Sequence, residues 1–138
     1  MQRQDYVQRL IEQLGVFFRQ VYRARELGRT DEALISVVHA QETLFGGPAA
    51  DYTQRSLEEQ FAALTRGESE RVACEKACAY AALLRSASEI YRDRGQDALA
   101  DGAALFSKAM LQLAAEHFPS NVRPAMDRFA ALQAQGGN

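Results

Sequence analysis

Residues 21–45 read VYRARELGRTDEALISVVHAQETLF, and residues 90–114 read IYRDRGQDALADGAALFSKAMLQLA. In both stretches a tyrosine is followed eleven positions later by a small residue and seven positions further by an alanine. Small residues at such spacing let two antiparallel helices approach closely. The pattern predicts two helical hairpins that are sixty-nine residues apart. Their packing positions are Tyr22, Ala33 and Ala40 in the first copy and Tyr91, Gly102 and Ala109 in the second.

This repeat is imperfect, because only five of the twenty-five superposed positions are identical. The segment between the two copies does not reproduce the pattern. We therefore expect a helical bundle or a short solenoid, and not a regular array of three repeats.

The composition is that of an ordinary globular domain of helical type. The 138 residues are 47% hydrophobic and 25% charged, and only three are prolines. We expect one domain over residues 1–138. A net charge of −2 gives no global argument for binding to nucleic acid or to an anionic membrane. No apolar run approaches the roughly 18 residues of a membrane span, and two cysteines make no disulfide framework. A cytoplasmic protein is expected.

Apolar periodicity and turn residues divide the chain into five or six helices. Ser56 and Glu59 have the spacing of a capping box, which predicts the start of a short middle helix. Val38 and Leu99 are expected to face the core. The predicted helices cover residues 3–27, 31–45, about 57–67, 70–94 and 98–117, and a last helix carries Met126, Phe129 and Leu132. Small or apolar residues surround the helix over 70–94, which predicts that it is central and the most buried.

Two resemblances agree with this all-α prediction. Gly28, Ala33 and Ala40 resemble the second half of a tetratricopeptide motif, and a second copy resembles it at Tyr91, Gly102, Phe106 and Ala109. The closing proline and the early tryptophan-type residue of that motif are absent. The opening residues 3–15, RQDYVQRLIEQLG, are similar to the start of a family of small bacterial helical proteins. These resemblances imply a tetratricopeptide-like fold and a bacterial cytosolic origin, and they bring no catalytic residues.

Cys74 and Cys78 are four residues apart on one predicted helix, so both thiols can lie on the same face. Together with His39 and His117 they make the four ligands that a tetrahedral zinc site requires. The four residues belong to three separate helices, however, and neither cysteine is part of a close C-x2-C pair. We therefore expect both cysteines to be packed in the core. A metal-binding or redox-responsive protein is the alternative.

Arginines give the first 29 residues a local positive charge. Arg19 and Arg23 are one helical turn apart and suit contact with phosphates, so a nucleic-acid-associated protein is a weaker alternative. The full set is Arg3, Arg9, Arg19, Arg23, Arg25 and Arg29. A solvated face, in which these arginines pair with carboxylates, explains the pattern equally simply. We expect nucleic-acid binding to be absent.

The clearest indication of a function is the presence of apolar side chains beyond those needed for the core. Val16 lies outside the main apolar stripe of the first helix, and three aromatic residues lie near the ends of elements. The expected interaction surface consists of Val16, Tyr52, Phe61 and Phe118. Helical hairpins bury one face and leave another for a partner. No serine or cysteine nucleophile occurs in a recognisable turn, so we expect no enzyme. The sequence thus predicts an interaction module without a cofactor, which binds a protein partner or forms a homodimer.

Overall fold

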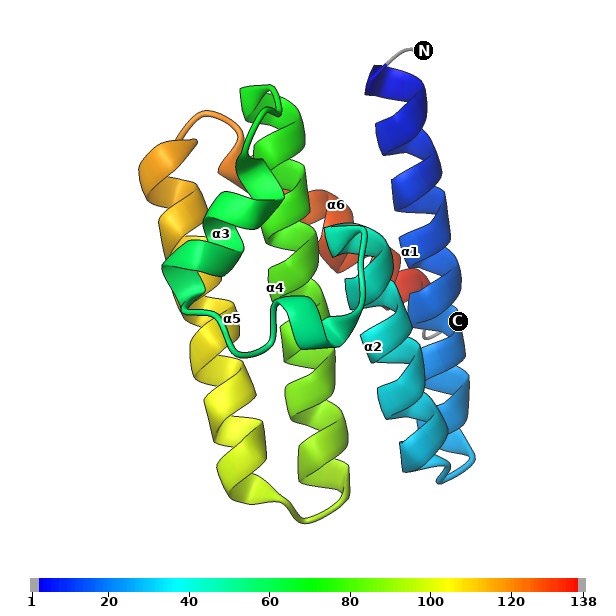
Figure 1. Cartoon of the computed structure of the whole chain (residues 1–138). Coiled ribbons are helices and arrows are strands. Elements are labelled where there is room, and N and C mark those ends of the chain that lie inside the picture. The colour runs from blue at the N-terminus through cyan, green and yellow to red at the C-terminus, as the bar shows by residue number, and fades with distance from the viewer. Residues whose placement is uncertain (1–2, 137–138) are drawn as a thin grey trace.

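The computed structural model describes residues 3–136, with the side chains of residue 6 and residues 8–134, as a bundle of six α-helices (Figure 1). The helices are α1 (Arg3–Glu26), α2 (Thr30–Phe45), α3 (Leu57–Thr65), α4 (Glu70–Asp93), α5 (Asp97–His117) and α6 (Val122–Gly136). A short 3-10 helix, η1 (Ala49–Asp51), follows α2. No residue of this range is in a strand, and the prediction of an all-α fold with five to six helices is confirmed.

Local sequence signals set the helix ends. The Ser56 hydroxyl accepts a hydrogen bond from the Glu59 amide at 3.1 Å, and the Glu59 carboxylate accepts one from the Ser56 amide at 2.9 Å. This reciprocal pair is the predicted capping box, and it satisfies two amides that the start of α3 leaves without helical partners. The hydrogen bonds from Ser56 lower the pKa of the Glu59 carboxyl.

α1 with α2 and α4 with α5 form two antiparallel hairpins whose turns lie at the same end of the molecule (Figure 1). The two turns have the same hydrogen bonds. Gly28 donates to the Arg25 carbonyl at 3.0 Å, and Gly95 donates to the Arg92 carbonyl at 3.0 Å. Both glycines have a positive φ, 72° and 74°, which a residue with a Cβ rarely adopts. Each turn is a Schellman motif, in which glycine ends the first helix of the hairpin.

Equivalent residues of the two hairpins are sixty-seven positions apart, as Gly28 and Gly95 are. The predicted offset was sixty-nine positions. In this register Ala33 corresponds to Ala100, and both are completely buried. Ala40 is also completely buried and corresponds to Ser107, which is 7% exposed.

The predicted packing position at Gly102 is therefore wrong. Gly102 is exposed, with no atom within 4 Å of the position that a Cβ would occupy, and Ala109 is only half-buried. The reason is that α1 continues four residues beyond Tyr22, whereas α4 continues only two residues beyond Tyr91. A superposition on the tyrosines therefore shifts the second helix by two residues. Tyr22 and Tyr91 are themselves half-buried.

Small residues bring α4 and α5 close together, but at other positions than predicted. The Ser88 hydroxyl on α4 donates to the Ala100 carbonyl on α5 at 2.7 Å. The Ser107 hydroxyl on α5 donates to the Ala81 carbonyl on α4 at 2.7 Å. A side chain that reaches the backbone of the neighbouring helix requires a close approach of the two helices, so these serines and alanines are the contact positions of this hairpin.

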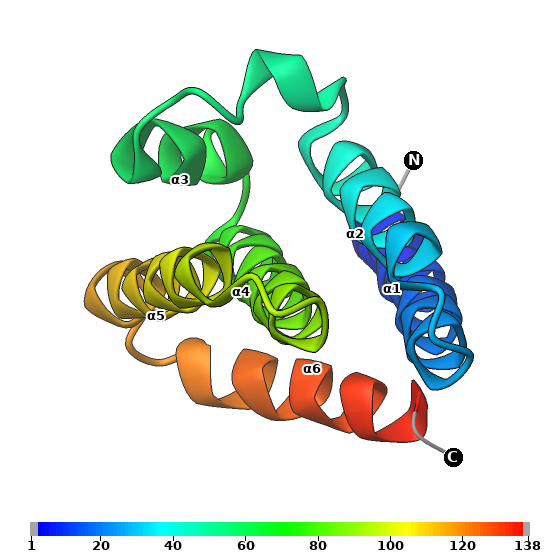
Figure 2. The same ribbon diagram turned by 90° about the horizontal axis from the view of Figure 1, so that it is seen from below.

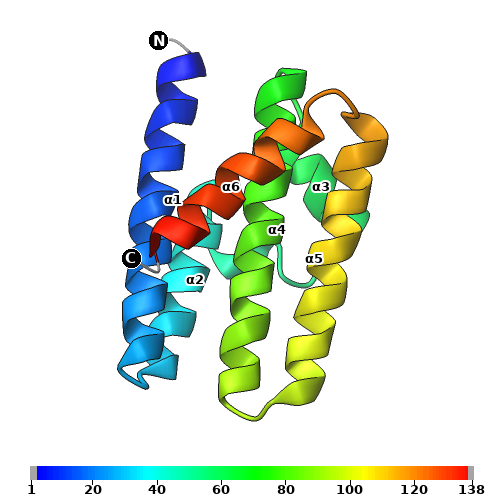
Figure 3. The same ribbon diagram turned by 180° about the vertical axis from the view of Figure 1, so that it is seen from behind.

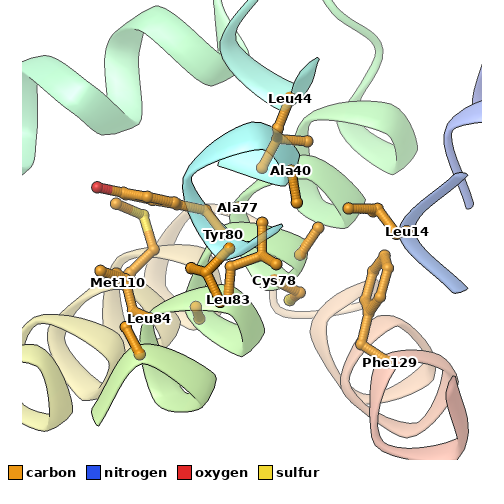
Figure 4. Packing of buried hydrophobic residues seen from close by; sticks show 14 of the residues in the cluster. Leu14, Ala40, Leu44, Ala77, Cys78, Tyr80, Leu83, Leu84, Met110 and Phe129 are labelled. Carbon is orange, nitrogen blue, oxygen red and sulfur yellow. The ribbon is translucent and has the colours of Figure 1, made fainter. Parts of the chain in front are cut away.

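α4 is the centre of the bundle, as its sequence predicted. Sixteen of its twenty-four residues are buried. Figure 4 shows side chains of the neighbouring helices around it, among them Leu14 of α1, Leu44 of α2, Met110 of α5 and Phe129 of α6. Burial of apolar side chains at about 25 cal/mol per Å² is the main stabilising contribution, and it is concentrated around α4.

α3 and α6 lie on opposite sides of α4 (Figure 2). α6 crosses diagonally from the end of α5 to α1 and contacts both hairpins (Figure 3). Arg128 of α6 pairs with Glu75 of α4, and the side chain of Glu75 is only 7% exposed. On α4, Lys76 pairs with Glu68 at 3.1 Å, and this pair is nearly buried as well. Buried charges require such partners.

Ion pairs connect the turn ends of the two hairpins in both directions. Arg25 of α1 donates to Asp93 of α4 at 2.7 Å and to Glu89 at 3.1 Å. Arg94, which follows α4, pairs with Asp31 of α2. The hydrogen bond to Asp93 is the main cause that raises the pKa of the Arg25 guanidinium.

Candidate functional site

The structure places both cysteines in the core. Cys74 is completely buried and Cys78 is 2% exposed, and neither forms a disulfide. A hydrogen bond with Cys74 and burial raise the pKa of the Cys78 thiol far above its ordinary value. Since the thiolate is the form that binds metals and attacks substrates, this thiol is poorly suited to either task at neutral pH.

The two histidines lie elsewhere. His39 is exposed on α2, beside Glu42 and Pro48 in a shallow depression. His117 is exposed at the end of α5, with its ring centroid 5.0 Å from that of Phe61. The part of the chain that the structure describes holds no group of three or more side chains arranged for a metal ion. The structure thus does not bring together the four residues that were considered for zinc.

The N-terminal arginines divide among several environments. Arg25 is bound by Asp93 and Glu89, and Arg29 lies 3.8 Å from Glu32. Arg23 is exposed on another side of α1. The side chain of Arg3 lies outside the described residues. Part of the positive charge of this segment is therefore balanced by carboxylates, as the solvated-face interpretation expects.

The predicted interaction surface is corrected at three of its four residues. Val16 is 43% exposed, as expected, but Phe61 is 8% exposed and Phe118 is half-buried. Tyr52 is 3% exposed because its ring stacks on that of Phe45, with centroids 4.0 Å apart and an interplanar angle of 6°. Burial raises the pKa of Tyr52 to about 12. These aromatic residues pack the ends of the core and are not available to a partner.

The exposed apolar side chains gather instead on the first hairpin. Leu27 is 59% exposed and Ile35 is 54% exposed, and Val38, which was expected to face the core, is 37% exposed. The described residues have eight exposed large apolar side chains, of which five lie on or directly beside α1 and α2: Tyr6, Val16, Leu27, Ile35 and Val38. The others are Leu99, Leu105 and Met126. Leu99 was also expected inside, and this prediction is wrong.

Leu27 and Ile35 line an open groove on the α1–α2 hairpin, which we call the outer groove. Its volume is about 490 Å³. Ala24 contributes to its wall, and charged residues of both signs border it, namely Arg23, Arg29 and Glu32. Leu27 and Ile35 are not among the residues predicted for the interaction surface. The available signal was that Ile35 is two residues from Ala33, which places it on the opposite side of α2 from the packing position.

A second concave region lies where α6 crosses between α1 and α4, and we call it the α6 cleft. It contains one cavity of about 420 Å³, lined by residues of α1, α4 and α6, and an adjoining one of about 130 Å³ between α4, α5 and α6. Arg85, Ala130 and Gln133 line both cavities. No local sequence pattern predicts this cleft, because it depends on the path of α6.

Comparison with known proteins adds no relationship. No protein-family model matches the chain, and neither the curated proteins nor the solved structures contain a significant match. Within residues 3–136, the helices include none that is both long enough and apolar enough to cross a membrane.

Proposed function

We propose that this chain is a non-enzymatic interaction module that associates with a second copy of itself through the outer groove of its α1–α2 hairpin. The observation that carries the proposal is the concentration of exposed apolar side chains on this hairpin, with Leu27 and Ile35 more than half exposed. Apolar surface that is contiguous and rimmed by polar residues is typical of interaction sites. Covering it removes apolar area from water, which favours association.

The charges around the outer groove favour a second copy as its occupant. A two-fold interface brings the same patch of both subunits together, so the patch must complement itself. The outer groove has both Arg23 and Glu32 at its border. Each copy thus offers both signs of charge to the other. A net charge of only −2 adds little repulsion between copies.

We also propose that the chain is a tetratricopeptide-like protein of the bacterial cytoplasm, in which the helical hairpins provide the binding surface. This proposal is supported by the arrangement of helical hairpins that bury one face and leave another accessible. It is also supported by Cys74 and Cys78, which are unlinked, as thiols are in a reducing compartment.

The mass in solution tests the self-association. Light scattering at micromolar concentration should give twice the 15.3 kDa of one chain for the wild type. The double variant Leu27→Asp, Ile35→Asp should give a single-chain mass, because two carboxylates in the outer groove must lose water on association. Leu105→Asp is the matched control, since Leu105 is 69% exposed on α5. A wild-type monomer at every concentration, or a double variant that still dimerises, would contradict the proposal.

A pull-down from bacterial cytosol distinguishes self-association from the role of an adaptor. If the wild type is monomeric and captures a protein that the Leu27→Asp, Ile35→Asp variant does not capture, the outer groove serves a different partner. The Leu105→Asp control should then capture the same protein as the wild type. Equal capture by all three would exclude the outer groove as the binding surface.

A further inference from the structure

The α6 cleft combines a charged side chain with a smaller, mainly apolar cavity, which we call the inner cavity. Arg85 lies on the exposed side of α4 and lines both cavities. The inner cavity of about 130 Å³ is bordered by Cys78, Leu111, Met126 and Phe129. This combination of an apolar cavity and few polar groups is typical of small-molecule sites.

The charge of Arg85 is not balanced by a neighbouring carboxylate. Glu89, one helical turn further along α4, is 3.1 Å from Arg25, and Asp93 is 2.7 Å from Arg25. Arg25 thus occupies both carboxylates on this side of α4. Arg85 forms no ion pair or hydrogen bond with any residue in the described part of the chain. Its guanidinium is available to an anion, and its planar fork of donors suits a carboxylate.

The polar donors inside the cleft already have partners. The Ser107 hydroxyl donates to the Ala81 carbonyl at 2.7 Å. The Gln133 amide donates to the Ala82 carbonyl and to the Ser86 hydroxyl, each at 3.2 Å. Beyond Arg85 the inner cavity therefore presents mainly apolar surface, and the part of a ligand that enters it must be apolar.

From this arrangement we infer that the α6 cleft binds a small monocarboxylate with a short apolar tail. The carboxylate lies on Arg85, and the tail enters the inner cavity beside Cys78 and Phe129. The inner cavity is small, about 130 Å³, and therefore suits a short tail. This site is separate from the outer groove, so its test does not depend on self-association.

Hexanoate is the probe for this site. Titration of the full-length protein with hexanoate, followed by amide NMR shifts, should show saturable changes at residues of α4 and α6 around Arg85. Hexylamine should produce no such changes, because its charge is repelled by the guanidinium. In a series of butanoate, hexanoate and decanoate, affinity should be highest near hexanoate. A steady rise through decanoate would indicate adsorption on apolar surface and would overturn the proposal.

Arg85→Gln tests the carboxylate contact. The substitution should weaken hexanoate binding about tenfold or more, since a charge-assisted hydrogen-bonded pair is lost. Arg66→Gln is the matched control, because Arg66 is exposed beyond the end of α3 and does not line the cleft. Equal affinities of the wild type and Arg85→Gln, with both proteins folded by circular dichroism, would overturn the assignment of the head group.

Discussion

The α1–α2 and α4–α5 hairpins have equivalent turns but different surroundings. Gly28 and Gly95 end their first helices with the same hydrogen bonds and nearly the same φ. α4 is nevertheless covered on most sides, whereas the outer side of α1 and α2 leaves Leu27 and Ile35 in water. The comparison teaches that a turn motif determines how a hairpin forms, while the packing around the hairpin determines whether it is core or surface.

Among the substitutions that test this comparison, Leu83→Ala should lower the free energy of unfolding most. Leu83 is completely buried on α4, so truncation leaves a cavity and should lower the free energy of unfolding by about 2–5 kcal/mol. Ile35→Ala removes a side chain that is 54% exposed and should change it by less than about 0.5 kcal/mol. Urea denaturation followed by circular dichroism measures both. Similar losses for the two variants would contradict the distinction between core and surface hairpins.

Ala100→Leu tests the contact between α4 and α5. Ala100 is completely buried, and its carbonyl accepts a hydrogen bond from Ser88. Extra methylene groups there force the helices apart, so the free energy of unfolding should fall by about 1–3 kcal/mol. Thermal denaturation is a sufficient measurement. If Ala100→Leu is neutral, the hairpin register of sixty-seven positions is wrong.

Gly102→Ala should have the opposite sign. Gly102 is in the interior of α5, and the added Cβ would meet no atom within 4 Å. The substitution should raise the free energy of unfolding by about 0.5–1 kcal/mol, because glycine costs conformational entropy in a helix. The same denaturation experiment measures it. A loss of stability would instead support the register of sixty-nine positions, in which Gly102 is a packing position.

Arg25→Gln should have the smallest effect. The side chain of Arg25 is 33% exposed, and its partners Glu89 and Asp93 are also partly exposed. Such pairs contribute about 0.2–1 kcal/mol, and salt screens them. The difference in unfolding free energy from the wild type should shrink in 1 M salt, whereas Arg66→Gln should show no difference in either condition. A loss that is independent of salt would contradict an electrostatic connection between the hairpin ends.

Much of the helical structure could be predicted because the signals that carry it are local. The capping box at Ser56 and Glu59 and the glycine at position 95 depend only on residues within one or two turns. The central position of α4 could also be predicted, since small and apolar residues surround it in the sequence itself.

The interaction surface could not be predicted as well, because burial depends on residues that are distant in the sequence. Phe61 packs against His117 on α5, with ring centroids 5.0 Å apart, and Tyr52, which directly follows η1, stacks on Phe45. The α6 cleft required the path of α6 across both hairpins, which no local pattern of Ala130 or Gln133 indicates. The exposure of Gly102 could not be predicted from the two tyrosines, because α4 ends two residues after Tyr91 whereas α1 ends four residues after Tyr22.

The contact of α6 with α1 has a consequence for synthesis on the ribosome. Residues 3–26 are made long before residues 122–136, which must arrive before these two helices can pack together. At about 5–20 residues per second, the delay is roughly 5–20 s. During that time the side of α1 that α6 will cover remains uncovered, and nascent chains are then most exposed to aggregation or to capture by chaperones.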